Sequence, residues 1–292
     1  MDKKGIIGRF LKRGILLSPE ELEEINEENY MQILESRGGA TEKKERIVVE
    51  PKGGKITPDE FIKTQNTKFE FLREILLKKI EAVSINKGRK VFSEVAIIGR
   101  VKELTGRGFV VEDVTGETEV VTENEETGIG DVLGAMGFFK ENCFFPKQII
   151  WPDVPLENTP NTPGKSITLT TKLKEGMKDV VVCPDAKPSE NVVTGFDKFG
   201  VVKITKGGSE IRILVFSPDK EKNEDGAVRI LKKRTVEGGG VVDDLIKEIP
   251  DIFWLFNNKR NWTKNYRGVV IISNDENSFA EYGEVGVRFG KI

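Results

Sequence analysis

The chain has 292 residues, which is enough for two domains with separate hydrophobic cores and a helical extension. Its 46 lysines and arginines nearly balance 48 aspartates and glutamates, so the net charge of −2 excludes a uniformly basic nucleic-acid-binding protein. The chain contains no histidine, which excludes catalytic triads with a histidine base and zinc or iron sites with histidine ligands.

The cysteine content and the hydropathy pattern indicate the cellular compartment of the protein. Cys143 and Cys183 are the only cysteines, and their spacing matches no metal-binding motif, so a reducing cytosol is the simplest environment. No apolar run reaches the length of a membrane span, and the N-terminus lacks the apolar core of a signal peptide. We therefore expect a cytoplasmic protein.

Residues 1–40 are predicted to form a helical N-terminal module. Apolar residues recur at helical spacing between Ile6 and Leu11. Further on, Ser18 and Glu21 form the pattern of a capping box, which marks the start of another helix. Such a module serves either as a plain packing element or as a docking unit for a partner, and the sequence leaves both interpretations open.

Residues 41–55 are predicted to be a polar linker with a pair of glycines near each end. Residues 56–88 are predicted to form a helix that leads into the next domain. Thr57 and Glu60 repeat the capping-box pattern, and apolar positions such as Leu72 follow. We expect this helix to pack against the domain that it precedes.

Residues 89–155 are predicted to form a small β-barrel. The runs Val95–Lys102 and Gly108–Val121 are rich in valine and isoleucine and are bounded by turn residues, which is typical of strands. Asp113–Gly116 carries a hairpin signal, and Trp151–Pro155 forms the exit. Five short strands that close on themselves predict an oligonucleotide/oligosaccharide-binding (OB) fold.

The barrel offers two interpretations. Single-strand-binding OB barrels combine basic residues with stacking aromatic rings. The stretch Glu117–Glu126 is acidic, however, which favours a barrel that docks a protein. The candidate nucleic-acid-binding residues are Arg100, Lys102, Arg107 and Phe109.

Residues 156–164 form a proline-rich linker, and residues 165–292 alternate short apolar runs with polar loops. Val241–Ile249 has the pattern of a short amphipathic helix. The predicted class of this part is α/β or α+β with a central sheet. The predicted strands include Val180–Val182, Val201–Ile204, Ile211–Phe216 and Val269–Ser273.

Four groups of segments follow one another along the chain: Phe10–Leu22; Ile56–Phe61 with Ala82–Asn86; Val95–Val101 with Gln148–Pro155; and Ile249–Phe253 with Asn265–Ser273. Together they resemble the small subunit of archaeal DNA polymerase D, a member of the B-subunit family of replicative polymerases. The resemblance implies an α+β multidomain protein with an N-terminal helical module, an OB barrel and a C-terminal metallophosphoesterase-like α/β domain. It spans almost the whole chain.

In that family the C-terminal domain is a calcineurin-like 3′→5′ exonuclease, in which two metal ions activate water for attack on phosphate. The resemblance places Lys172 and Lys174 at the positions of the first Asp-x-His motif. It places Asn257 and Lys259 at the positions of the last two histidines. The middle motifs have no counterpart, and the domain is shorter than that of the family.

Lysine ammonium groups at ligand positions repel the cations that the family binds, so we expect no metal, no cofactor and no catalytic residue. A new acidic site and phosphate binding by the lysines remain as alternatives. A nearby aromatic cluster is predicted either to fill the vacated pocket or to form an exposed partner surface. The acidic candidates are Asp179, Asp185, Asp197, Asp219, Asp243 and Asp244, and the aromatic cluster comprises Phe253, Trp254, Phe256 and Trp262.

The resemblance therefore implies an inactivated, non-catalytic scaffold subunit that forms a heterodimer with the large catalytic subunit of DNA polymerase D. Any contact with DNA would then be made through the complex. Two alternatives stay open. One is a stand-alone OB protein that binds single-stranded nucleic acid, and the other is a divergent exonuclease that remains active with relocated ligands.

Overall fold

The computed structural model describes residues 46–51, 57–123, 126–156, 158, 161, 166–174, 177, 180–184, 186–187, 191–195, 198–206, 209–236 and 245–292. The chain divides into two compact units. The smaller unit comprises residues 1–48 and 203–210, and the larger comprises residues 49–202 and 211–292. The helical module predicted over residues 1–40 lies outside the described residues. Within the described ranges, no helix combines the length and the apolar composition needed to cross a membrane.

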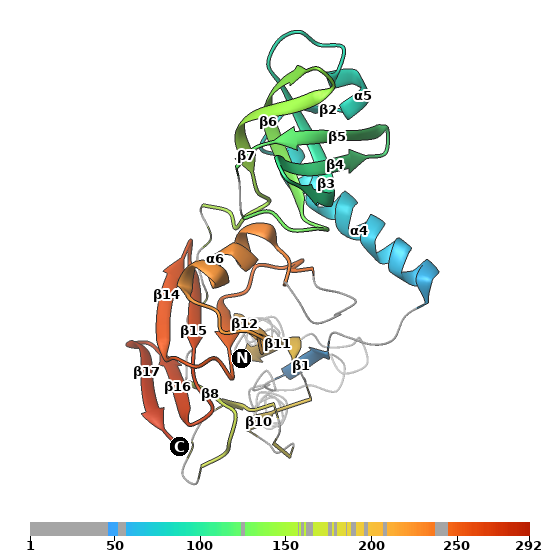
Figure 1. Cartoon of the computed structure of the whole chain (residues 1–292). Coiled ribbons are helices and arrows are strands. Elements are labelled where there is room, and N and C mark those ends of the chain that lie inside the picture. Colours follow the sequence, from blue (N-terminus) through green and yellow to red (C-terminus); the bar gives the residue numbers. More distant parts are fainter. Residues whose placement is uncertain are drawn as a thin grey trace, which may run out of the picture. The chain divides into compact units, whose positions relative to one another are not determined.

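Helix α4 spans Pro58–Leu77 and begins at the predicted capping box. The Thr57 hydroxyl accepts a hydrogen bond from the Glu60 backbone at 3.3 Å, and the Glu60 carboxylate accepts one from the Thr57 backbone at 2.9 Å. The short elements β2 (Ala82–Val83) and α5 (Ile85–Gly88) follow and lead into the barrel (Figure 1).

Five strands close into a barrel. They are β3 (Val95–Thr105), β4 (Gly108–Asp113), β5 (Gly116–Val121), β6 (Val132–Lys140) and β7 (Cys143–Ile150). The sheet order is β2-β3-β4-β5-β7-β6, and an additional pairing of β3 with β6 closes it. The predicted β pattern of this region is therefore confirmed, and the barrel is OB-like in strand number and closure.

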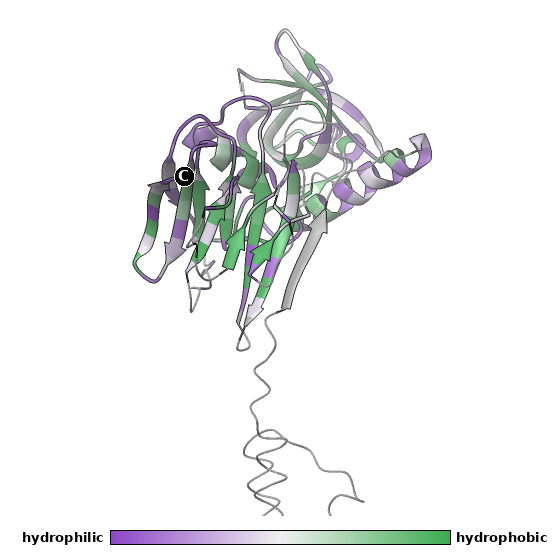
Figure 2. Ribbon diagram, turned by 90° about the horizontal axis from the view of Figure 1, so that it is seen from below, coloured by the Kyte–Doolittle hydropathy of each residue, from purple (hydrophilic) through white to green (hydrophobic). Residues whose placement is uncertain are grey.

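The barrel has a core of its own, and α4 packs on its outside. Inward-facing residues such as Phe109, Val120 and Phe144 are almost completely buried and form one cluster. A second cluster joins Leu72 and Leu76 of α4 to the barrel strands. The predicted packing of this helix against the barrel is confirmed. Figure 2 shows α4 as mainly hydrophilic, as expected for a helix that buries only one stripe.

Outside the barrel, the described residues form two further sheets with mostly hydrophobic strands (Figure 2). The sheet orders are β1-β11-β12-β13-β15-β14 and β10-β9-β8-β16-β17. Strands β12, β13 and β15 run parallel, and β14 is antiparallel to β15. The strands are β1 (Arg46–Pro51), β8 (Ile167–Thr170), β9 (Val180–Val182), β10 (Val192–Val193), β11 (Phe199–Lys206), β12 (Ser209–Phe216), β13 (Ile252–Leu255), β14 (Trp262–Tyr266), β15 (Val269–Ser273), β16 (Ser278–Gly283) and β17 (Gly286–Lys291).

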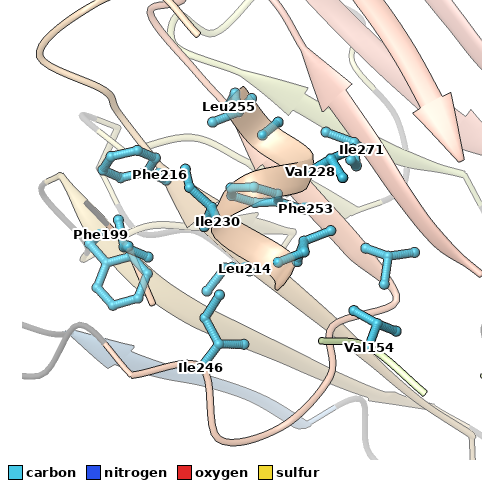
Figure 3. Close-up of a cluster of buried hydrophobic side chains, with 14 residues drawn as sticks. Val154, Phe199, Leu214, Phe216, Val228, Ile230, Ile246, Phe253, Leu255 and Ile271 are labelled. Carbon is cyan, nitrogen blue, oxygen red and sulfur yellow. The ribbon is translucent and has the colours of Figure 1, made fainter. Parts of the chain in front are cut away.

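Helix α6 (Glu224–Lys233) covers the six-stranded sheet. Its Ile230 and Leu231 are fully buried and lie in one cluster with Phe253 and Leu255 of β13 (Figure 3). The Asn223 side chain caps the helix by accepting a hydrogen bond from the Gly226 backbone at 2.8 Å. Burial of such side chains contributes about 1.5–3 kcal/mol each, so this cluster stabilises the C-terminal part.

The fold departs from the sequence predictions in three places. The stretch predicted as a linker over residues 41–55 contains strand β1. The helix predicted over Val241–Ile249 is absent in its described half, where Leu245 forms a β-bridge with Thr235 instead. Helix α6 was not predicted from the sequence. By contrast, β9 and β15 have the bounds that the sequence predicted.

Candidate functional site

The three predicted nucleic-acid-binding cations of the barrel all form ion pairs with glutamates of β4 and β5. Arg100 pairs with Glu112, its cross-strand neighbour, and the Lys102 ammonium lies 2.6 Å from the Glu117 carboxylate. Arg107 pairs with Glu119 in the same way, and Thr105 donates a hydrogen bond to the Glu119 carboxylate at 2.9 Å. Each positive charge on this face is thus matched by a negative one.

These pairs also change the acidity of their members. The hydrogen bond and the charge of Glu117 raise the pKa of Lys102, and the hydrogen bond from Thr105 lowers the pKa of Glu119. Phe109, the predicted stacking ring, is 1% exposed and belongs to the barrel core. The structure therefore brings the three cations together on one face but directs the phenylalanine ring away from it.

The two segments that the resemblance places at the positions of nuclease motifs meet at one edge of the C-terminal part. Lys172 and Lys174 follow the end of β8, and Asn257 and Lys259 follow the end of β13. All four side chains are exposed. Both segments contact the connection between β15 and β16. Thr171 donates to the Glu276 carbonyl at 3.3 Å, and the backbone of residue 258 donates to the carbonyl of residue 274 at 3.2 Å.

A buried network of neutral side chains lies beneath this edge. Asn258, Ser273 and Asn274 are at most 1% exposed. The Asn258 amide donates to the Ser273 hydroxyl at 2.8 Å, and the Asn274 amide donates to the Ser278 carbonyl at 2.8 Å. The Asn274 carbonyl oxygen accepts the indole N–H of Trp254. These residues were not predicted from the sequence, because a network of neutral side chains corresponds to no recognisable motif.

The residues at this edge do not fit the two-metal site that the resemblance implies. Two divalent cations need anionic oxygens or neutral imidazoles as ligands. The implied positions carry three ammonium groups and one amide, and the side chains beneath them are uncharged. In the part of the chain that the structure describes, no group of three or more Cys, Asp or Glu side chains is arranged to hold a metal ion.

Two alternatives of the sequence analysis concern the same region. Of the acidic candidates, Asp219 is exposed and pairs with Lys198 at 2.7 Å, and the other five lie outside the described residues. Phe253, Trp254 and Phe256 are at most 3% exposed, so the prediction of an exposed aromatic surface is wrong for them. They lie on or just after β13, whose side chains face the hydrophobic cores on both sides of the sheet.

A second polar cluster forms where the barrel exit meets the C-terminal strands. Asp153 adopts a left-handed backbone conformation with φ of 56°. Its carboxylate accepts a hydrogen bond from the Tyr266 hydroxyl at 2.9 Å and pairs with the Arg267 guanidinium at 2.8 Å. Arg267 also donates to the Val154 carbonyl at 2.7 Å. Trp151–Pro155 and Asn265–Ser273, two of the segments that carry the resemblance, are therefore in direct contact.

The contact between the barrel and the C-terminal part, which we call the joint, also contains a buried ion pair. The Lys233 ammonium at the end of α6 lies 2.8 Å from the carboxylate of Asp131, which precedes β6 of the barrel. The side chains are 3% and 7% exposed. Lys233 also lies 5.5 Å from the ring centre of Trp151. Beside it, burial lowers the pKa of Arg234 to about 10, and its guanidinium donates to the Ile246 carbonyl at 2.9 Å.

Comparisons with known proteins agree in part with the resemblance. No family model matches the chain. The chain is 30% identical over 108 residues to the DNA polymerase II small subunit of Archaeoglobus fulgidus. The match covers 34% of this chain and 22% of that protein, so the chain corresponds to about a fifth of the length of the relative. This similarity supports a relationship of the chain to archaeal DNA polymerase small subunits.

Proposed function

We propose that this chain is a non-catalytic accessory subunit of a family D DNA polymerase and that it binds the large catalytic subunit as a scaffold. The OB barrel and the shortened metallophosphoesterase-like domain would both be retained for this role, and the large subunit would perform the polymerase reaction. The similarity to a DNA polymerase small subunit supports the polymerase part of the proposal.

The observation that carries the proposal is the joint around Asp153. The resemblance rests on segments that are distant in sequence, and two of them, Trp151–Pro155 and Asn265–Ser273, contact each other through the Asp153 carboxylate. A chance likeness of short segments would have no reason to place them side by side. The contact is therefore what we expect if the resemblance reflects a shared architecture.

The second support is the chemistry of the implied nuclease positions. Lys172, Lys174 and Lys259 are exposed cations, and Asn258 and Asn274 beneath them are neutral. A two-metal phosphodiesterase lowers the pKa of a bound water and neutralises the charge that develops on phosphate. These side chains can bind an anion, but they offer no ligand set for two divalent cations. We therefore propose that hydrolysis is absent while the fold persists.

The association is tested by co-expressing the chain with an affinity-tagged large subunit of a family D polymerase from the same cell. We expect a stoichiometric complex that stays together during size-exclusion chromatography. Separate elution of the two proteins at micromolar concentration would overturn the scaffold role. The control is the variant Ile62→Ala in the same assay. It changes an exposed side chain of α4 and controls for general surface effects.

The absence of catalysis is tested with a 3′-labelled single-stranded oligonucleotide in the presence of Mn²⁺ or Mg²⁺. We expect no shortening of the oligonucleotide. The matched control is Lys172→Ala with Lys259→Ala, because these substitutions change only exposed side chains. Nuclease activity that copurifies with the wild type and changes in the variant would contradict the proposal.

A further inference from the structure

The face of the barrel formed by β6 and β7 carries an exposed aromatic strip. We use this name for Phe92, Phe138 and Phe145. Phe138 and Phe145 are cross-strand partners, and their side chains are 37% and 41% exposed. Phe92 is fully exposed and lies three residues before Val95, which pairs with Gly137 next to Phe138. Phe138 and Phe145 are therefore neighbours on one outer surface, and Phe92 lies on the segment that leads into β3 beside them in the sheet.

Lysines accompany this strip. The Lys147 ammonium lies 4.7 Å from the ring centre of Phe138 and 2.8 Å from the Glu94 carboxylate. Lys90 and Lys140 are exposed, and neither forms an ion pair with any described residue. Two acidic side chains lie among these groups, namely Glu94 and Glu141 at the tip of the β6–β7 hairpin. The lysines thus outnumber the carboxylates here.

The contrast with the β4–β5 face shows what this surface offers. On β4–β5 the cations pair with Glu112, Glu117 and Glu119, and the phenylalanine ring is buried. On β6–β7 the rings are exposed and two of the three lysines have no carboxylate partner in the described part of the chain. Binding of single-stranded nucleic acid requires this second combination, because bases stack on ring faces and ammonium groups neutralise phosphates.

We propose that the aromatic strip binds single-stranded nucleic acid. Phe138 and Phe145 lie at the separation of cross-strand neighbours and receive stacked bases together with Phe92. Lys90, Lys140 and Lys147 contact the phosphates, and Lys147 leaves its ion pair with Glu94 to do so. Recognition is independent of base sequence, since no polar side chain of the strip is placed to distinguish bases. This proposal goes beyond the scaffold role and stands on the β6–β7 surface alone.

The test is a fluorescence anisotropy titration of the full chain, without any polymerase subunit, against a fluorescein-labelled oligothymidylate of about 20 nucleotides. We expect saturable binding at low salt. Phe138→Ala with Phe145→Ala should weaken it at least about tenfold, since each stacked ring contributes substantially to affinity. Lys140→Ala should reduce the slope of log K against log salt by about 0.7, the value for one phosphate contact on a single strand.

Two matched controls separate this surface from the rest of the barrel. Leu104→Ala removes an exposed apolar side chain from another face and should leave binding unchanged. Lys102→Ala removes a cation that already pairs with Glu117 and should also leave it unchanged. Circular dichroism and thermal unfolding verify that the phenylalanine variants are folded.

Three outcomes would overturn the proposal. One is no binding at low salt, and another is binding that Lys102→Ala abolishes while the phenylalanine variants retain it. The third is a phenylalanine variant that binds the oligonucleotide normally in the titration. If the same variant also loses the large subunit in the association experiment, the strip is a protein-docking surface. Because the titration contains this chain alone, its failure leaves the scaffold role to the separate association experiment.

Discussion

The larger unit contains two polar clusters that differ in whether their buried side chains carry a charge. At the joint, Asp131 and Asp153 each face a cation from the C-terminal part at 2.8 Å. At the edge beyond β13, the buried groups are amides and hydroxyls, and lysines such as Lys172 remain outside in solvent. Burying a charge is costly unless it is paired. Among the described residues, buried charges are therefore paired at the joint, whereas the buried side chains beneath the β13 edge are neutral.

The largest effect should come from breaking the buried ion pair of the joint. Asp131→Ala leaves the Lys233 ammonium, 3% exposed, without the carboxylate 2.8 Å away. We expect a loss of about 3–5 kcal/mol in the free energy of unfolding, measured by urea denaturation with tryptophan fluorescence. The double variant Asp131→Leu with Lys233→Met should recover most of it. A loss below about 1 kcal/mol in the single variant would show that the pair is solvated.

A smaller effect should follow from neutralising Asp153. Asn tolerates the left-handed conformation that Asp153 adopts, with φ of 56°, so Asp153→Asn removes the charge and keeps the backbone. We expect a loss of about 1.5–3 kcal/mol, because both partners lose a hydrogen bond to a charged group. A double-mutant cycle with Tyr266→Phe should give a coupling of at least about 0.5 kcal/mol. Additive losses would contradict the direct contact.

The neutral cluster should respond differently to pH. Asn274→Ala removes the acceptor of the Trp254 indole and should cost about 1–3 kcal/mol. Because the Trp254 indole and the Ser278 carbonyl do not titrate in this range, the loss should be equal at about pH 6 and about pH 9. Urea denaturation at both pH values measures it. A loss that grows with pH would reveal an ionisable group in the network.

The joint, by contrast, should contribute less to the free energy of unfolding at alkaline pH. Burial raises the pKa of Tyr266 above its ordinary value of 10, and the hydrogen bond to Asp153 raises it further. Above pH 10 the Tyr266 hydroxyl therefore stays protonated in the folded chain but loses its proton in the unfolded chain. The contribution of Tyr266 to the free energy of unfolding is complete below pH 10 and is lost as the pH rises above it. We expect a shallower decline in Tyr266→Phe. Some decline should remain, because burial also raises the pKa of Tyr282. Denaturation at several alkaline pH values tests both statements.

The smallest effect is expected at the exposed lysines of the edge. Lys172→Ala and Lys259→Ala should each change the free energy of unfolding by less than about 0.5 kcal/mol, because both side chains are exposed. Thermal unfolding is a sufficient measurement. A larger loss in either variant would show that the lysine stabilises the fold and would weaken the contrast between the two clusters.

Much of the fold follows from local sequence signals. Val180–Val182 and Val269–Ser273 are short runs of mainly apolar β-branched residues, and both form strands with the predicted bounds. The capping pattern from Thr57 to Glu60 specified the start of α4 because both hydrogen bonds are local. Such signals involve residues a few positions apart, and they can therefore be recognised without knowing the tertiary structure.

Other features depend on distant partners or on competing signals. Helix α6 was missed because Gly226 weakens its helical pattern, although Asn223 and the acidic first turn were available as start signals. Leu245 lies in a stretch with a helical pattern but forms a β-bridge with Thr235, because tertiary contacts override a weak local preference. The ion pairs of Asp153 and the network of Asn274 join residues whose proximity exists only in the folded chain.

The closure of the barrel has a consequence for the order of folding during synthesis. Every barrel strand finds its partners between Ala82 and Ile150, so the barrel can form once that stretch has left the ribosome. Strand β8 pairs with β16, which is translated much later, and the ribosome adds only about 5–20 residues per second. Asp131 is therefore in place seconds before its partner is made.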